Sequence, residues 1–196
     1  MNALELLRND HTAVLGLLSD LDKIAADATR KKKMQMLNLI EREVKIHTAL
    51  EEKIFYPAFR KAAKDGGDTE LVHEAVEEHH LVDKVLPDLK ILALKKDGFL
   101  AKLRVTERIV NEHIEREETE MFPRAQKILG AGALDRIGDR MSREKEKLYK
   151  SWTGLVRGPL HRGKSLVDKV TPLAAKELRV RARAKSKKAS PSRKKK

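Results

Sequence analysis

The sequence contains no cysteine. This excludes disulfide bonds, thiolate-bound zinc, iron–sulfur clusters and a cysteine nucleophile, and it favours a reducing compartment. Aromatic residues make up only 4% of the chain, and there are only 10 glycines and 6 prolines among 196 residues. Glu, Lys, Leu and Ala dominate instead, a composition that favours helices over β-sheet.

Long apolar runs are also missing. No segment is apolar over the length that a helix needs to span a bilayer, so we expect no transmembrane segment. The first ten residues include Glu5, Arg8 and Asp10, whereas a secretory signal peptide needs an apolar stretch there. These absences together predict a soluble, cytoplasmic protein.

The net charge of +13 is distributed unevenly along the chain. Residues 157–196 hold 15 Lys and Arg against two acidic residues, whereas residues 1–156 hold 28 basic and 28 acidic residues. The chain is therefore a neutral body followed by a basic tail. The last part of this tail, Arg179–Lys196, has almost no apolar side chains to bury, so we expect it to be disordered.

Apolar residues recur every three or four positions in five segments, which is the spacing of amphipathic helices. The predicted helices cover roughly residues 2–27, 30–64, 70–96, 99–129 and 134–153. The glycine-containing stretch Asp65–Thr69 is predicted to end the second helix, and Pro87 is predicted to kink the third.

Four long helices joined by short loops are expected to pack as antiparallel neighbours. The predicted fold class is therefore all-α, an up-down-up-down four-helix bundle over residues 1–130. Residues 131–156 are predicted to form an accessory helix packed on the bundle. Residues 157–196 are predicted to form the basic, largely disordered tail.

One stretch of the sequence, residues 41–57, is repeated at residues 107–123. The two copies share Glu-Arg, Val, His, Glu-Glu and Pro at the same offsets. Each copy carries a histidine and a glutamate four residues apart, His47 with Glu51 and His113 with Glu117. Because residues four apart lie on one face of a helix, each pair can reach one ion or two adjacent ions.

A second repeat relates residues 9–21 to residues 77–89. Both segments contain an acid followed by His, then Val, Leu and Asp-Leu at fixed offsets, which selects His79 over His73 and His80. The repeating unit is thus a helical hairpin, and two copies around a pseudo-twofold axis bring six candidate metal ligands together. These are His11, His47, Glu51, His79, His113 and Glu117.

Four imidazoles and two carboxylates without sulfur suit iron or manganese, and less specifically zinc or copper. Burying these groups is costly unless a bound metal satisfies them. The twofold repeat suggests two ions bridged by Glu51 and Glu117, with coordination positions left open. The alternative is a bundle with a buried polar network and no metal, which would carry six costly groups without compensation.

The motifs that carry these residues resemble those of a known family. They are Asp10-His11, His47-x-x-x-Glu51, Glu78-His79 and His113-x-x-x-Glu117, with Phe-Tyr-Pro and Phe-Pro closing the second and fourth helices. Over residues 1 to about 155 the chain resembles the hemerythrin-like HHE cation-binding family. The resemblance implies a non-haem site of two iron ions (Fe-O-Fe), with manganese or zinc ranked lower.

The resemblance also implies roles in binding, sensing or scavenging oxygen, peroxide or nitric oxide, in iron handling, or in the repair of iron centres. The sequence departs from the oxygen-carrier hemerythrins, whose third helix supplies two histidines four residues apart. Here Ala75 and Asp83 flank His79 at that spacing, and Asp83 ranks below the six candidates as an extra carboxylate.

The predicted function is that of a di-iron protein that binds, senses or detoxifies a diatomic ligand or peroxide, or handles iron. Its enzyme status is left open, with a binding role favoured over a di-iron oxidoreductase, and no catalytic residue is assigned. Glu52 and Glu118 are predicted to be charges on the helix surface. Packing alone and shielding of the site from water explain Tyr56 and Phe122 equally well.

The basic tail supports an alternative function. Lysine and arginine clustered without aromatic residues favour contacts with phosphates over stacking on bases, so Arg179–Lys196 could bind DNA with the bundle as scaffold or sensor. A membrane surface ranks lower as a partner of this tail. A solubilising tail without a dedicated partner is the third possibility.

Overall fold

The computed structural model describes residues 1–63, 66–95 and 97–155. All regular secondary structure in these ranges is helical, and they contain no strand, which confirms the predicted all-α class. No helix within the same ranges is both long enough and apolar enough to cross a membrane. The tail that was predicted to be disordered lies outside the described residues.

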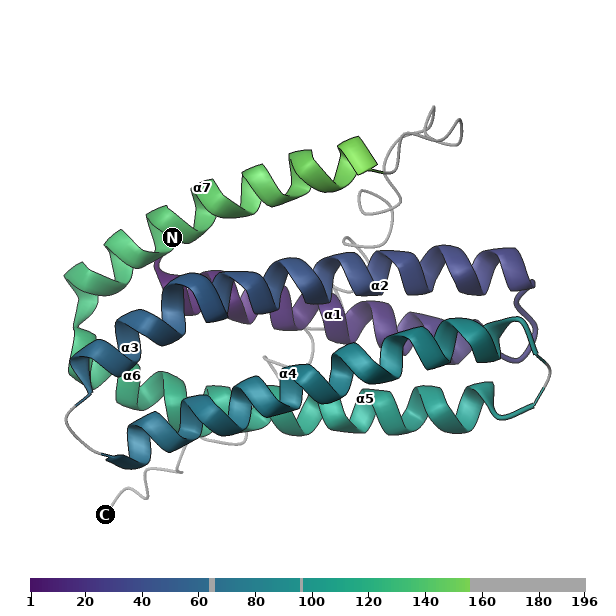
Figure 1. The fold of residues 1–196 in the computed structure, drawn as a ribbon, viewed down its shortest axis with the longest axis horizontal. Coiled ribbons are helices and arrows are strands. Elements are labelled where there is room, and N and C mark those ends of the chain that lie inside the picture. Colours follow the sequence, from purple (N-terminus) through teal and green to yellow (C-terminus); the bar gives the residue numbers. More distant parts are fainter. Residues whose placement is uncertain (64–65, 96, 156–196) are drawn as a thin grey trace, which may run out of the picture. The chain divides into compact units, whose positions relative to one another are not determined.

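Long helical rods lie side by side along the long axis of residues 1–155 (Figure 1), and four of them pack against one another. They begin with α1 (Ala3–Ile24), α2 (Arg30–Leu50), α4 (Gly66–Ala93) and α5 (Phe99–Arg116). α2 continues through η1 (Glu51–Phe55) into α3 (Tyr56–Ala62), and α5 continues through η2 (Glu117–Met121) into α6 (Phe122–Leu129). α1 contacts α2 and α5, and α4 contacts the same two helices, so the four rods enclose a common interior.

The helix ends follow from local sequence. The Asn2 side chain accepts from the Glu5 backbone N–H while the Glu5 carboxylate accepts from the Asn2 N–H, a capping box at the start of α1. The Thr29 hydroxyl accepts from the backbone N–H of Lys32 at the start of α2. Gly98 before α5 and Gly130 after α6 have φ of 83° and 71°, a backbone conformation that favours glycine.

The third long helix differs from the prediction at both ends. α4 runs from Gly66 to Ala93, whereas the sequence predicted residues 70–96. Its first turn absorbs glycines that were expected to lie in the loop, because Asp68 places a negative charge near the helix N-terminus and pairs with Arg124 at 3.2 Å.

The second and fourth long helices each contain a π-helical segment that the sequence reading did not predict. Pro57 and Pro123 follow these segments, and a proline lacks an N–H and clashes with the carbonyl four residues earlier. The hydrogen-bond ladder widens there, so that Tyr56 N–H donates to the Glu51 carbonyl and Phe122 N–H donates to the Glu117 carbonyl. Such π segments are common at functional sites.

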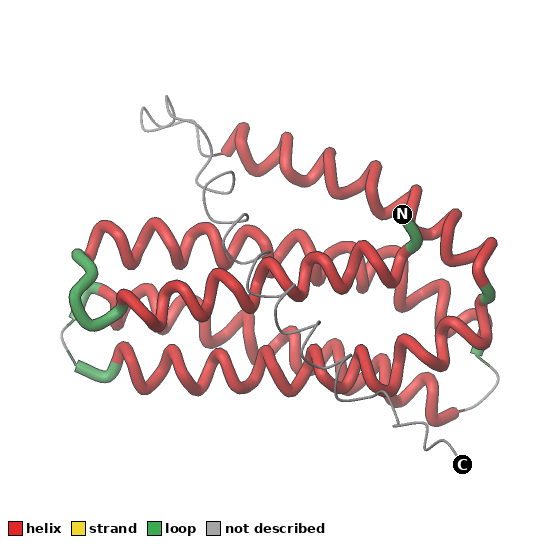
Figure 2. Tube along the Cα trace, turned by 180° about the vertical axis from the view of Figure 1, so that it is seen from behind, coloured by secondary structure: helices red, strands yellow, loops and turns green. Residues whose placement is uncertain are grey.

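A further helix, α7 (Ala131–Leu155), contacts α1, α2, η1 and α6. The N-terminus of α1 lies beside it (Figure 2). A Cβ atom at Gly138 would be 2.4 Å from the Met1 carbonyl oxygen and 2.7 Å from the Ala3 nitrogen, so only glycine permits this approach. Leu134 and Met141 of α7 are buried in the same core cluster as Phe55, Phe59 and Phe122.

Candidate metal centre

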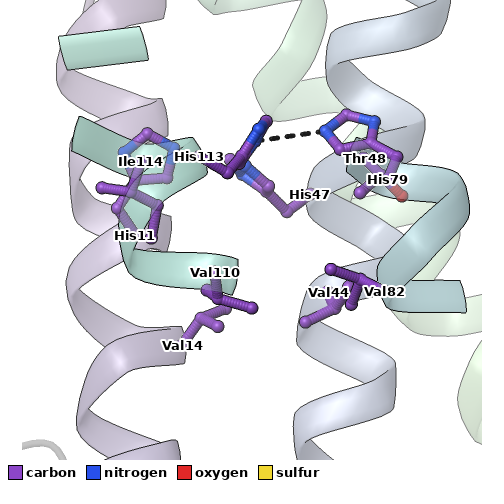
Figure 3. Close-up of a pocket in the computed structure, with 10 residues that line it drawn as sticks. All are labelled: His11, Val14, Val44, His47, Thr48, His79, Val82, Val110, His113 and Ile114. Atoms are coloured by element: carbon purple, nitrogen blue, oxygen red, sulfur yellow. Dashed lines mark hydrogen bonds between the residues drawn. The ribbon is translucent and has the colours of Figure 1, made fainter. Parts of the chain in front are cut away.

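All six predicted ligands converge between the four rods. α1, α2, α4 and α5 each contribute one histidine, and η1 and η2 each begin with one of the two glutamates. Each of the six is at most 6% exposed. Figure 3 shows the four imidazoles turned toward a common centre, with one valine from each of the four helices on one side of them.

The potential ligand atoms form two overlapping groups, each with all of its atoms within 4.8 Å of one another. The groups are His11, His47, Glu51 and Glu117, and Glu51, His79 and His113. Glu51 Oε2 lies 3.1 Å from His47 Nε2 and 3.3 Å from His79 Nε2. Glu51 is the residue that the two groups share.

Glu117 occupies the equivalent position in the second hairpin. Its Oε2 lies 3.1 Å from His11 Nε2 and 3.6 Å from His113 Nε2. Each of the two glutamates therefore lies between a histidine of its own hairpin and a histidine of the other. This is the arrangement that the twofold repeat in the sequence predicts.

Three of the four histidines have a carboxylate within hydrogen-bond distance of Nδ1, the ring nitrogen that faces away from the centre. The Nδ1 atoms of His11, His79 and His113 each lie 2.8 Å from an oxygen of Glu118, Glu52 and Glu78, respectively. An acid at Nδ1 fixes the orientation of the ring and directs Nε2 to the centre. The fourth pair is looser, because His47 Nδ1 lies 3.8 Å from Asp10 Oδ2, which is too long for a hydrogen bond.

Glu52 and Glu118 lie at the helix surface, as the sequence predicted, with side chains that are 40% and 34% exposed. The prediction missed that the carboxylate of each reaches the imidazole of a neighbouring helix. The sequence did hold a signal for them, since the Glu-Glu pair occurs in both copies of the repeat. His73 and His80 are more than half exposed, and Asp83 pairs with Lys45 at the surface, away from the cluster.

Tyr56 adds a hydroxyl to the cluster. Its Oη donates to Glu117 Oε1 at 2.8 Å and lies 3.5 Å from His79 Nε2, and its ring stacks on the His79 ring. The residue at the equivalent position of the repeat is Phe122, which stacks on His11 with a centroid distance of 5.7 Å. At this position the two halves of the centre therefore differ by one hydroxyl group.

The charges of the cluster are strongly coupled. Burial alone would lower the pKa of His47, but the carboxylates of Glu51 and Asp10 outweigh it and raise that pKa to about 10. Burial is likewise outweighed at His79, where Glu51 and Glu52 raise the pKa to about 9. Burial would raise the pKa of Glu51, but His47 and His79 hold it well below its usual range.

Several atoms of the cluster lack a hydrogen bond although they are buried. In the described part of the chain, seven buried side-chain nitrogen and oxygen atoms have no hydrogen-bond partner, and all of them belong to Asp10, His11, His47, Glu51 or Glu117. Buried polar atoms are nearly always satisfied in proteins. A cation held by imidazole nitrogens and carboxylate oxygens would satisfy those that face the centre, and such a ligand set suits iron or manganese. The residues present therefore fit a metal.

A cavity of about 30 Å³ adjoins the four histidines (Figure 3). Its apolar lining comes from all four rods and consists of Val14, Val44, Val82, Val110 and Ile114. Thr48 is the only polar residue in its lining apart from the histidines. The volume accommodates one or two molecules of the size of water or a diatomic gas.

A helical protein with a buried histidine–glutamate cluster belongs to the class of cation-binding helical bundles. The family described as "Hemerythrin HHE cation binding domain" matches residues 2–125. The chain therefore belongs to the hemerythrin HHE cation-binding family, as its motifs predicted.

Comparison with curated proteins adds distant relatives. The chain is 26% identical over 152 residues to uncharacterized proteins of Mycobacterium bovis (strain ATCC BAA-935 / AF2122/97) and Mycobacterium tuberculosis (strain CDC 1551 / Oshkosh), covering 77% of this chain and 89% of theirs. It is 23% identical over 158 residues to a DNA nickase of Nostoc sp. (strain PCC 7120 / SAG 25.82 / UTEX 2576), covering 81% of this chain. The matched part is 43% of the Nostoc protein, less than half of its length. No solved structure matches the chain.

Proposed function

We propose that this protein holds two iron ions inside a hemerythrin-like, up-and-down four-helix bundle, and that it binds, senses or detoxifies oxygen, peroxide or nitric oxide, or handles iron. The proposed ligands are His11, His47, Glu51, His79, His113 and Glu117. One observation carries the proposal: the six buried side chains form two potential ligand groups that share Glu51, and all but one of the buried atoms without a hydrogen-bond partner belong to residues of the first group. Manganese and zinc rank below iron.

In this proposal the side chains around the centre have different roles. The carboxylates of Glu52, Glu78 and Glu118 hold three of the imidazoles by Nδ1, so that Nε2 is left for a metal. Glu51 and Glu117 lie between the hairpins and would bridge the ions. Bound iron would supply open coordination positions and a change of oxidation state.

The surroundings of the histidines favour small uncharged ligands. The valine-lined cavity next to the four imidazoles has no charged group other than those of the centre, and it is too small for an organic substrate. Next to the glutamates, the Tyr56 hydroxyl donates to Glu117, and the rings of Tyr56 and Phe122 stack on His79 and His11. These features support oxygen, peroxide or nitric oxide as the ligand.

Iron content and spectra test the proposal. Protein purified in air should hold about two iron ions per chain with the near-ultraviolet absorption of paired ferric iron, and its spectrum should change with nitric oxide or peroxide. His113→Ala should lower both the metal content and the stability, because metal binding contributes to folding. The matched control is His73→Ala, which alters an exposed histidine. A fully loaded preparation that contains only zinc would refute the iron assignment.

A second candidate function is binding of DNA through Arg179–Lys196. It is favoured by the uneven distribution of charge, because residues 157–196 have a net charge of +13 and residues 1–156 have a net charge of zero. The distant Nostoc relative is described as a DNA nickase, which agrees with this candidate. Deleting residues 179–196 should abolish retention on DNA without changing the metal content, and DNA binding by the full chain should weaken steeply with salt. Equal DNA binding by the truncated protein would exclude the tail.

A further inference from the structure

The two acids at equivalent positions of the repeat, Asp10 and Glu78, make different contacts. In the repeat, Asp10 beside His47 corresponds to Glu78 beside His113. Glu78 uses one oxygen for His113 Nδ1 at 2.8 Å and the other for the Arg116 guanidinium, also at 2.8 Å. Asp10 has one oxygen 3.8 Å from His47 Nδ1, and its other oxygen pairs with Lys145. Asp10 therefore contacts its lysine closely and its histidine only loosely.

Side-chain length and origin explain this difference. Aspartate is one methylene shorter than glutamate, so Asp10 cannot reach both partners as Glu78 does. The lysine that pairs with Asp10 in place of His47 also comes from outside the four rods, since Lys145 lies on α7. The position of α7 is set by the close approach of Gly138 to the backbone of residues 1–3 and by the fully buried Met141. Lys145 is thus held at a fixed place beside Asp10.

An acid hydrogen-bonded to the far nitrogen of a ligating histidine orients the ring and strengthens it as a ligand. His47 alone among the four lacks such a bond, and a positive charge stands behind its acid. We propose that Lys145 is a positioning residue that draws Asp10 away from His47, so that the ion held by His11 and His47 is the more weakly bound of the two. The inference rests on the proposed function, because it needs two metal ions.

Calorimetric titration of the metal-free full-length protein with ferrous iron, in the absence of oxygen, tests this. The wild type should bind in two steps of unequal affinity. In Lys145→Met, Asp10 is free to close on His47, and the weaker step should tighten by about 10-fold, the lower end of the effect of such hydrogen bonds. Asp10→Glu should do the same by copying the arrangement of Glu78. Lys147→Met is the matched control, because it removes an exposed lysine of α7 that pairs with Glu144 on the same helix.

Lys145→Arg keeps the cation and should restore the two unequal steps. Urea unfolding of each metal-free variant separates an effect on the centre from a loss of folding, since only the iron affinity should change in this pattern. Two equal steps in the wild type, or a weaker step left unchanged or weakened by Lys145→Met, would overturn the inference. If the wild-type protein binds no iron at all, the proposed function fails instead.

Discussion

Loading the metal-free protein with iron at pH 7 should release about two protons per chain, or more. A histidine must lose its proton from the nitrogen that binds a metal. The carboxylates around His47 and His79 raise the pKa values of these imidazoles to about 10 and about 9, so both are protonated at pH 7 before the metal arrives. The pKa of His11 is also raised, against the effect of burial, by Glu117 and Glu118, which adds to the release.

The free-energy cost of this deprotonation sets the pH dependence of binding. At about 1.4 kcal/mol for each pH unit below the pKa, neutralising His47 at pH 7 costs about 4 kcal/mol and neutralising His79 costs about 3 kcal/mol. Iron affinity should therefore rise about 100-fold for each pH unit between 7 and 9, while two protons are displaced. Between pH 9 and 10 the slope should fall to about 10-fold, because only His47 still carries a proton.

Calorimetry in two buffers of different ionisation enthalpy measures the number of protons directly. At pH 7 the apparent enthalpies should differ by about two buffer ionisation enthalpies per chain loaded. His80→Ala should leave this number unchanged, because that imidazole is exposed and away from the cluster. Release of less than one proton per chain would mean that the imidazoles are already neutral before iron binds, and it would refute the electrostatic reasoning.

Three further outcomes follow from the same structure. The raised pKa values of His47 and His79 stabilise the metal-free protein, fully so below about pH 6.5, and this stabilisation is lost as the pH rises through 9 to 10. The urea midpoint of the metal-free protein should therefore fall across this pH range. The midpoint of the iron-loaded protein should not show this fall. Tyr56→Phe removes the hydrogen-bond donor to the buried carboxylate of Glu117 and should lower the free energy of unfolding of the metal-free protein by about 1–3 kcal/mol, measured by chemical unfolding. His73→Ala, at an exposed residue, is the control and should leave this free energy unchanged. Gly138→Ala places a Cβ against the backbone of residues 1–3. It should lower the free energy of unfolding by about 1–3 kcal/mol, which a lower thermal midpoint and faster proteolysis of α7 would show. Gly132→Ala, whose new Cβ would meet the flexible Arg136 side chain, should leave the stability unchanged or raise it. Equal midpoints for the two glycine variants would contradict the proposed packing of α7.

The sequence was sufficient to identify the residues that gather at the centre. His47 with Glu51 and His113 with Glu117 lie on one helix face by the local rule of four-residue spacing, and the internal repeat extended the set to His11 and His79. Whether all six residues bind the metal is a prediction that the iron-binding experiments test. The all-α class also followed from periodicity, because long amphipathic stripes specify helices.

Contacts between helices were beyond the sequence. Glu52 follows Glu51 and so points about 100° away from the stripe that faces the interior, which by helical periodicity alone is the surface. Only the packing of α4 against the α2 rod shows that this direction leads to His79. The contact between Asp10 and Lys145 joins residues 135 positions apart in sequence, and no local pattern marks it.

The π segments set the two glutamates of the centre apart from its four histidines. The histidines stand on regular α-helix, whereas Glu51 and Glu117 open the π segments, where a helix carries about one extra residue per turn. The wider turn brings the side chain five positions later back toward the face of the glutamate, whereas a regular α-helix would carry it past that face. This register places Tyr56 beside Glu117 and His79, and Phe122 beside His11, so the local widening of the two helices adds an aromatic ring to each half of the centre.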